Sequence, residues 1–368
     1  MKELNKQNLH DILLGAAILG TGGGGNLTEG IKLIDKALDE GFKFKLADLD
    51  EIPDDALVGT PYGCGSVSPL TTEQIEAQSK LPKIKTTAEV AAVKVMEKYY
   101  EESFYGLVAT ELGGKNTAVA LEASGRLNKP LIDADPAGRS VPCLQHSTYY
   151  LKDVPIYPLS IANSHGDEML ITKAVSDERA EALTRAAAVS SFNHVGVVDH
   201  PNRWSVLKNT LLNKTISLCL QIGQTARKAK DEDVNFAYPV ADKFNGYILF
   251  EGVIDKATWE DRDGFTFGEY YIEGSNKFNG QKMKIWFQNE NIISWLNNEI
   301  YVTVPDSINI VDIENNMPLL NPYGEKGMKV TVFGLKAFDE WRSEKGLEVF
   351  GPKFFNYDND YKEIEKFF

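Results

Sequence analysis

The sequence has few cysteines, and none lies in a pattern typical of a disulfide framework or a zinc site. Its three cysteines, Cys64, Cys143 and Cys219, are odd in number and far apart, with no Cys-x-x-Cys or Cys/His ligand spacing. Long apolar runs are also missing, because no stretch approaches the length of a membrane span and the N-terminus lacks a signal-peptide core. We therefore expect a cytoplasmic protein that makes no membrane contact.

Basic residues are in deficit. The 368 residues contain 39 Lys and Arg against 53 Asp and Glu, which gives a net charge of −14. Nucleic-acid binding requires a basic surface, so this balance excludes nucleic acid as an expected partner. The acidic excess is spread thinly along the chain and favours solubility. A hydrophobic content of 43% is enough for a real core, and the length is enough for two domains.

One stretch, from Tyr105 to Gln145, combines buried-strand patterns with many polar side chains. A short apolar strand ends in a glycine turn, a helix is predicted over 117–127, and a second apolar strand follows Pro130. A strand, helix and strand of this length form a βαβ crossover, so the two strands are parallel and end at the same edge of a sheet. Ligands bind at that edge in open α/β sheets. The polar side chains expected there are Glu111, Asn116, Asp133, Asp135 and Arg139.

The three carboxylates at this edge have two interpretations. Acidic residues after strands often cap the next helix. Gathered in a cleft, carboxylates instead raise one another's pKa, which suits them to general acid or base catalysis, or they bind a divalent metal. The pattern predicts a site for a polar ligand without specifying a reaction, and Glu111, Asp133 and Asp135 are its candidate catalytic residues.

A glycine-rich segment separates two helices predicted over 7–19 and 27–40. Dense glycine lets a ligand approach backbone N–H groups at a helix start, where the helix dipole favours an anion. The segment follows no strand and matches neither a Walker loop nor a GxGxxG motif, so no nucleotide is expected. The alternative is a flexible turn between helices. The candidate ligand contacts are Thr21, Gly22, Gly23, Gly24 and Gly25.

A second turn rich in small and hydroxyl residues follows a strand predicted over 56–61. Its Cys64 and Ser66 are candidate substrate contacts. Cys64 is also a possible nucleophile, although no His follows in a recognisable motif and a lone cysteine more often fills a small buried space. The segment SHGDE, 164–168, places a His beside an Asp, but the apolar strands on both sides favour a hairpin turn.

The composition changes in the second half of the chain. Helical patterns cover 177–191 and 203–230, and short strands separated by turns fill 235–335. Such a succession of short strands indicates a small β-barrel or sandwich.

These patterns predict an α/β protein of two domains. Residues 1–163 form an N-terminal layered α/β domain with parallel strands. Residues 164–368 form a C-terminal mixed domain, with helices at 177–230 and a β-barrel at 235–335. The aromatic tail, 350–368, is interpreted as a docking or oligomer contact, and a homo-oligomer is expected.

Several motifs in this order resemble one family. They are LGTGGGG at 19–25, TELGGKN at 110–116, PLIDADPAGRSVP at 130–142, GFTFGEYYIEG at 264–274 and FQNEN at 287–291. Together they are similar to the bacterial and archaeal family long called DUF917, now described as S-methyl thiohydantoin desulfurase-like. The resemblance covers nearly the whole chain. It implies an α/β layered domain followed by a domain with a β-barrel.

The same resemblance implies a hydrolase that replaces the methylthio group of an S-methylated thiohydantoin by oxygen and releases methanethiol. Family members are linked to hydantoinase and oxoprolinase systems. Members usually have Gly-Met-Gly-Arg after Asp-x-Asp, where this chain has Pro136-Ala137-Gly138-Arg139, and they often carry a Gly-Ala-Pro turn near 67–69. The departures alter the expected pocket wall and therefore the substrate more than the chemistry.

Such a reaction requires a base, an acid and donors for the ring atoms. Asp133 or Asp135 is expected to activate water with Glu111 as its counterpart, while Asn116, Arg139 and the amides of 22–25 hold the polar ring. A divalent metal on these carboxylates remains an alternative. A second hypothesis is a non-catalytic subunit that binds a hydantoin-like metabolite beside a hydantoinase or oxoprolinase-type ring-opening enzyme.

Overall fold

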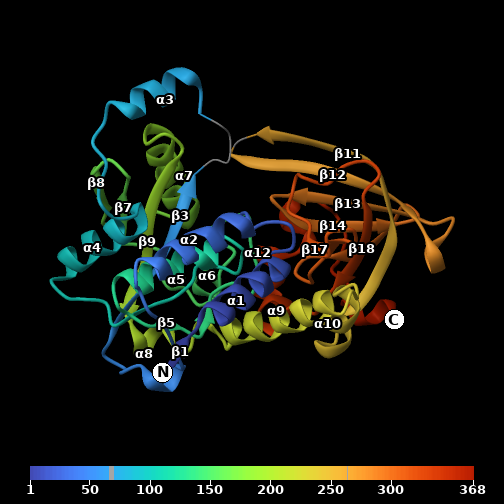
Figure 1. Ribbon diagram of the computed structural model, residues 1–368, viewed down its shortest axis with the longest axis horizontal. Coiled ribbons are helices and arrows are strands. Elements are labelled where there is room, and N and C mark those ends of the chain that lie inside the picture. The colour runs from blue at the N-terminus through green and yellow to red at the C-terminus, as the bar shows by residue number, and fades with distance from the viewer. Residues whose placement is uncertain (66–69, 263) are drawn as a thin grey trace.

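The computed structural model describes residues 1–65, 70–262 and 264–368. Two eight-stranded sheets lie side by side, and helices fill the space around and between them (Figure 1). This arrangement is an α/β fold with a parallel-stranded first sheet and a curled, barrel-like antiparallel second sheet, as the sequence predicts.

The first sheet has parallel strands at its centre and antiparallel strands at both sides. Its order is β1-β2-β5-β4-β3-β9-β7-β8, and the pairs β2–β5, β5–β4 and β4–β3 are parallel. The strands are β1 (Lys2–Leu4), β2 (Phe44–Ala47), β3 (Leu57–Gly65), β4 (Gly106–Leu107), β5 (Leu131–Ile132), β7 (Leu159–Ala162), β8 (Glu168–Ile171) and β9 (His194–Arg203). A two-stranded ladder joins β6 (Ala134–Asp135) to β10 (Leu212–Asn213).

Helices cover this sheet, and further helices extend from it toward the second sheet. They are α1 (Lys6–Leu19), α2 (Leu27–Asp39), α3 (Thr72–Ser79), α4 (Ala88–Tyr100), α5 (Asn116–Arg126), α6 (Thr148–Leu151), α7 (Asp177–Ser190), α8 (Trp204–Leu207), α9 (Thr215–Asp231) and α10 (Ala237–Lys243). α5 connects β4 to its parallel neighbour β5, which confirms the predicted crossover. Most residues of α5 are buried, because its run of small and apolar residues packs on both sides.

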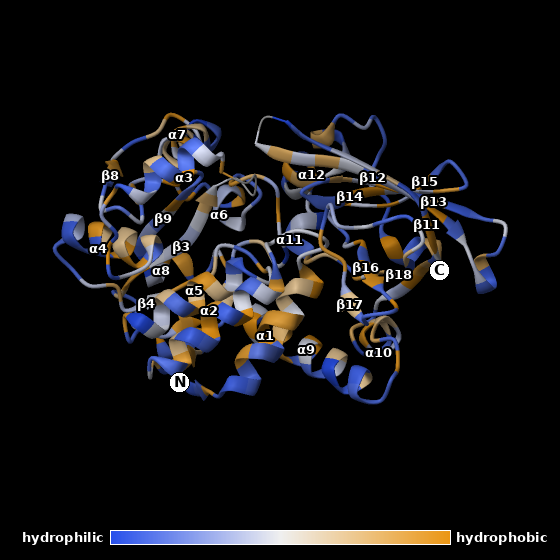
Figure 2. Cartoon of the chain, turned by 45° about the horizontal axis from the view of Figure 1, so that its top comes forward, coloured by the Kyte–Doolittle hydropathy of each residue, from blue (hydrophilic) through white to orange (hydrophobic). Residues whose placement is uncertain are grey.

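The pair α1 and α9 connects the two halves of the molecule. Side chains added at Gly15 or Gly223 would overlap the backbone of Cys219 or Asp11, so glycine is what lets the two helices touch. The later turns of α1 are mostly hydrophobic (Figure 2). One continuous core joins these helices to Val311 of the second sheet.

The second sheet is antiparallel throughout, with the order β15-β14-β13-β12-β11-β18-β16-β17. Its strands are β11 (Tyr247–Arg262), β12 (Phe265–Gly274), β13 (Lys282–Gln288), β14 (Glu290–Leu296), β15 (Glu299–Thr303), β16 (Asn309–Asp312), β17 (Met317–Pro318) and β18 (Lys329–Gly334). Alternating burial along β12 and β13 shows that one face of the sheet packs on a core.

The C-terminal segment first contacts the first domain, through Trp341, and then runs along the second sheet to its end. It contains α11 (Asp339–Arg342), α12 (Glu344–Phe350) and two 3₁₀ turns, η3 (Pro352–Phe355) and η4 (Ile364–Phe367). The ring of Phe368 stacks on Tyr247 of β11, with 4.6 Å between the ring centroids, and Phe367 packs on Tyr301 of β15. These last residues therefore bridge two strands that are not neighbours in the sheet.

The structure corrects two sequence predictions in part and confirms a third. The helix predicted over 203–230 is wrong in its first part, because β9 ends at Arg203 and the continuous helix, α9, begins only at Thr215. The hairpin predicted for SHGDE is confirmed by the antiparallel pair β7–β8. The interpretation of the aromatic tail as a docking contact is wrong for Phe350 and Phe355, which are buried within the chain.

β9 was missed because its apolar run contains His, Pro and Asn, yet it pairs with both β3 and β7 near the middle of the first sheet. β8 and β9 thus add strands from beyond residue 163 to this sheet.

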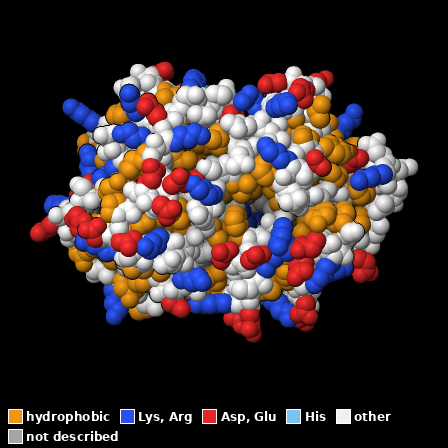
Figure 3. Space-filling model, turned by 90° about the horizontal axis from the view of Figure 1, so that it is seen from below, with side chains coloured by type: hydrophobic (Ala, Val, Ile, Leu, Met, Phe, Trp, Pro, Cys, Tyr) orange, Lys and Arg blue, Asp and Glu red, His pale blue; other side chains and the backbone are white. Residues whose placement is uncertain are grey.

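The surface carries both signs of charge. Acidic and basic side chains are interspersed over the face in Figure 3, with hydrophobic side chains between them. Within residues 1–65, 70–262 and 264–368, no helix combines the length and the apolar character that crossing a bilayer requires.

Candidate active site

Glu111 lies in the turn between β4 and α5, at the edge of the sheet that the crossover predicts. Its carboxylate accepts hydrogen bonds from the side-chain amide of Asn116 and from the backbone N–H of Val141, the latter at 2.8 Å. Glu111 is buried, and burial raises the pKa of its carboxyl group above the usual range. Asn116 and Glu111 are therefore brought together, as the sequence suggested.

Glu290, at the start of β14, faces Glu111 from the second domain. The Ser140 hydroxyl donates to its Oε1 at 2.9 Å, and the same hydroxyl lies within bonding reach of Glu111. Burial, together with the charge of Glu111, raises the pKa of Glu290 to about 8. Its Oε2 is buried and has no hydrogen-bond partner among the residues that the structure describes. Two carboxyl groups from two domains thus share one serine.

Sequence reasoning missed Glu290 as a site residue. Its only signal was its place in the motif FQNEN, 287–291. A single acidic residue at the start of a strand carries no local pattern that separates a buried carboxyl from a solvated one. Its proximity to Glu111 depends on how the two sheets pack.

The raised pKa of Glu290 predicts how stability depends on pH. Its carboxyl binds a proton up to about pH 8 when folded but only to about its ordinary 4.5 when unfolded, so the folded state holds more protons in this window. The free energy of unfolding should therefore fall as pH rises from 4.5 toward 8, by up to about 1.4 kcal/mol per pH unit for one proton. Urea unfolding at several pH values measures this slope. Glu290→Gln should make the slope shallower by the share of one proton, while Asp135, whose pKa is also raised, keeps its own contribution. An unchanged slope in that variant would contradict the assignment.

Asp135 lies at the end of β6, near enough to Glu111 to be affected by its charge. Its Oδ2 accepts from the N–H groups of Ala137 and Gly138 at 2.9 and 2.8 Å, which shapes the turn after β6. Its Oδ1 is buried without a hydrogen-bond partner in the described part of the chain. Burial, partly offset by these N–H donors, raises the pKa of Asp135 to about 7, and the charge of Glu111 adds to the rise.

Asp133 has different surroundings. Its Oδ1 accepts from the N–H of Ser217 at 2.8 Å and its Oδ2 from the Ser217 hydroxyl at 2.6 Å, in the first turn of α9. Lys214 lies 3.7 Å from Oδ2. Both oxygens thus serve the start of α9, which is the capping alternative for a carboxylate after a strand.

These bonds predict the effect of Asp133→Asn. The amide keeps one acceptor and loses the second, so we expect the free energy of unfolding to fall by about 1–2 kcal/mol. Turnover per folded molecule should change little. If Asp133 instead activated water, the variant would be inactive. Denaturant unfolding and a turnover assay on the same preparation separate these outcomes.

Arg139 is buried and uses its donors on neutral oxygens. Its Nε donates to the carbonyl of Ser140, and one terminal nitrogen donates to the Thr21 hydroxyl at 2.6 Å and to the carbonyl of Asn291. The other terminal nitrogen donates to the carbonyls of Pro305 and Asp306. Burial lowers the pKa of Arg139 to about 10, while Glu290 and other nearby carboxylates oppose this change. Arg139 therefore holds both domains together and places a positive charge near the carboxyl pair.

The glycine-rich segment, 22–25, packs against three other parts of the chain. A side chain at Gly22 would contact Asn321, one at Gly23 would overlap the Glu290 carboxylate, and one at Gly24 would overlap the backbone of Gly113. The carbonyl of Gly24 accepts from two N–H groups at the start of α5. The segment is thus an ordered loop beside the carboxyl pair, and Gly23 and Gly25 remain half-buried.

The remaining predicted contacts lie elsewhere or outside the description. Cys64, near the end of β3, lies by Glu181 and Arg185, and burial raises the pKa of its thiol to about 11, so it is protonated at neutral pH. Ser66 and the turn at 67–69 fall outside the described residues. In the described ranges, no three His, Cys, Asp or Glu side chains are grouped so as to hold a metal ion.

The geometry suits proton transfer. A carboxyl with a pKa of about 8 retains its proton at neutral pH and so has a proton to donate, which a general acid requires. Like charges so close together favour one proton shared by the pair. Asn116, Ser140 and the N–H of Val141 fix the orientation of both groups.

Comparison with known proteins places the chain in a family. The model of the S-Me-THD-like N-terminal domain matches residues 7–173, and that of the S-Me-THD-like C-terminal domain matches residues 175–364. A search among curated proteins gave no match.

An X-ray structure of a protein from Chromobacterium violaceum has the same fold. It matches with a TM-score of 0.76 and 21% identity, over 99% of this chain and 100% of that one. At this identity the likeness concerns the fold alone. From the two domain matches, the chain belongs to the S-Me-THD-like family, the S-methyl thiohydantoin desulfurase-like family that its motifs resemble.

Proposed function

We propose that the protein is a hydrolase that replaces the methylthio group of a hydantoin-like ring by oxygen and releases methanethiol. The observation that carries this proposal is the buried pair Glu111 and Glu290 on the Ser140 hydroxyl. Membership of the S-Me-THD-like family supports the substrate class. Glu290 takes the place that Asp133 had in the sequence hypothesis, because the oxygens of Asp133 are bound to Ser217.

The reaction needs four proton transfers, because each of the two carboxyl groups takes up one proton and gives up one. As water adds to the ring carbon that bears sulfur, Glu111 accepts a proton from the water and Glu290 donates its proton to the ring nitrogen. The carbon–sulfur bond then breaks and its electron pair leaves with sulfur. Glu111 returns its proton to the methanethiolate, and Glu290 accepts the proton of the new hydroxyl as the carbonyl forms. Both carboxyl groups end in their starting states.

The neighbours of the pair support these transfers. Asn116 orients Glu111, and the positive charge of Arg139 limits the rise of both pKa values. Gly23 packs directly against the Glu290 carboxylate, because a β carbon added at Gly23 would overlap its Oε1. The glycine loop therefore helps to hold Glu290 in place.

The test is release of methanethiol from a panel of S-methyl thiohydantoins, with unmethylated hydantoins as controls. Turnover of the methylated compounds alone supports the proposal. Tight binding without turnover, together with co-purification of a ring-opening enzyme, would support the non-catalytic subunit instead. Elemental analysis of the active preparation decides whether a divalent metal takes part.

A further inference from the structure

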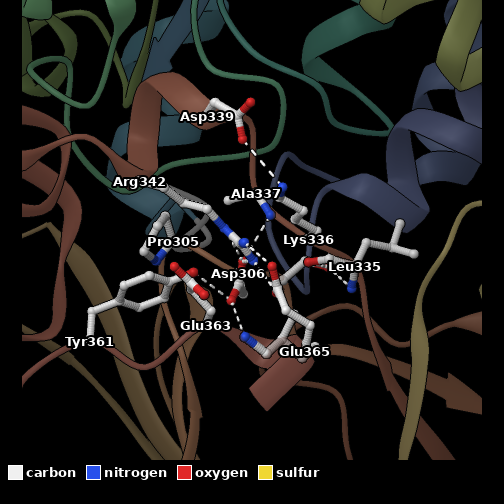
Figure 4. Close-up of polar contacts among 12 residues, drawn as sticks. Pro305, Asp306, Leu335, Lys336, Ala337, Asp339, Arg342, Tyr361, Glu363 and Glu365 are labelled. Carbon is white, nitrogen blue, oxygen red and sulfur yellow. Dashed lines mark hydrogen bonds and ion pairs between the residues drawn. The ribbon is translucent and has the colours of Figure 1, made fainter. Parts of the chain in front are cut away.

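Asp306, between β15 and β16, is the centre of a buried network built by the C-terminal segment (Figure 4). Its Oδ1 accepts from the N–H of Ala337 at 2.8 Å and from the Arg342 guanidinium at 2.5 and 3.2 Å. Its Oδ2 accepts from the Tyr361 hydroxyl at 2.7 Å and from the N–H of Ile364 at 2.9 Å. Arg342 also binds Glu365 through two nitrogens.

The backbone of the same residue contacts the candidate site. The carbonyls of Pro305 and Asp306 accept from one terminal nitrogen of Arg139 at 3.1 and 3.4 Å. The side chain of Asp306 thus belongs to the C-terminal network, while its carbonyl belongs to the surroundings of Arg139. If Asp306 moves, the C-terminal network and the carbonyl oxygen that binds Arg139 move together.

The C-terminal segment holds the loop of Arg139 at three further points. The indole N–H of Trp341 donates to the carbonyl of Ala137 at 2.8 Å, and the ring of Phe338 fills the space beside Gly138. The guanidinium of Arg139 lies 5.0 Å from the ring centroid of Phe350. These residues come from α11, α12 and the turn before α11, all far along the chain from Arg139.

We propose that the C-terminal segment, 337–365, positions Arg139 through Asp306, so that Asp306 and Arg342 are positioning residues for the pair Glu111 and Glu290. This inference rests on the proposed function for its effect on turnover. The physical reason is that the bonds of Arg139 to carbonyl and hydroxyl oxygens are directional. When those oxygens move, the positive charge moves relative to both carboxyl groups.

Arg342→Lys tests this positioning without changing net charge. Lysine keeps the positive charge but lacks the planar fork that reaches Asp306 and Glu365 together. The matched control is Arg227→Lys, because Arg227 forks to the buried Asp11 through Nε and a second nitrogen and contacts α1 rather than the loop of Arg139. Arg227→Lys loses the fork to one carboxylate, and Arg342→Lys loses the forks to two.

Two readouts are needed. The first is an infrared titration of the Glu290 carboxyl group, which requires no substrate. The carboxyl band is assigned by its loss in Glu290→Gln. Glu290 faces Glu111, which comes from the other domain. It also faces Arg139 and Cys143, which come from the loop after β6. Because Arg139 lowers its pKa, loosening Arg139 should move the midpoint upward. The second is the kinetics of methanethiol release.

We expect Arg342→Lys to raise the infrared midpoint and to lower kcat about tenfold with little change in KM, while Arg227→Lys leaves both as in the parent protein. Equal behaviour of the two variants at equal folded fraction, or an unmoved midpoint in Arg342→Lys, would overturn the inference. A raised midpoint in a protein that releases no methanethiol would leave the positioning intact and reject the proposed reaction.

Discussion

Glu290→Gln is expected to lower kcat for methanethiol release by about 100-fold or more, the usual contribution of a positioned general acid. Glutamine keeps the shape of the side chain and accepts from Ser140, but it carries no carboxyl proton to donate. Ligand binding should persist, because the glycine loop and Asn116 are unchanged. The measurement is kcat and KM for methanethiol release, alongside binding of a non-hydrolysable hydantoin.

The matched control is Glu251→Gln. Glu251 is also a buried carboxylate of the second sheet, bound by the Tyr238 hydroxyl and by Asn276, and it lies outside the candidate site. It should lose stability without loss of turnover per folded molecule. Full activity in Glu290→Gln would remove the proposed acid. Equal losses in both variants would show that turnover reports only folding.

Gly24→Ala should be the most destabilising single change in the glycine loop. Gly24 has φ +72°, and a side chain there would overlap the α carbon of Gly113. Neither backbone can retreat easily, because the carbonyl of Gly24 binds the N–H groups of Lys115 and Asn116. Strain of the left-handed backbone and overpacking together predict a loss of about 3 kcal/mol or more in the free energy of unfolding.

Gly41→Ala separates these two effects. Gly41, after α2, has φ +87° but nothing within 4 Å of the added carbon. It should cost about 1 kcal/mol, from the backbone alone. Urea unfolding measures both variants. Similar losses would mean that the contact between Gly24 and Gly113 is soft, and that the loop is the flexible turn which the sequence also allowed.

Local patterns predicted much of the first domain correctly. The apolar runs before Glu111 and Asp133 specify short buried strands, and the spacing of Ala and Leu between them specifies α5. Their length fixes a parallel connection, and the turn from the first strand into α5 brings Glu111 beside Asn116. These features follow from neighbours in the sequence, so residue order alone was sufficient.

Other features lacked a local signal. β9 was missed because its residues suit a strand only when β3 and β7 flank it. Asp133 and Asp135 are equivalent in sequence pattern, yet one binds the start of α9 while the other has a buried free oxygen beside Glu111. Which role each takes depends on where α9 packs.

The sequence by itself determined many of the element types, the crossover that delivers Glu111, the place of the glycines between two helices, and the family. Only the tertiary structure decided that Glu290 meets Glu111 on Ser140, and that the C-terminal segment closes around Arg139. The physical reason is that periodicity and turn chemistry act between near neighbours, whereas the pKa of a buried carboxyl is set by groups that packing brings from distant segments.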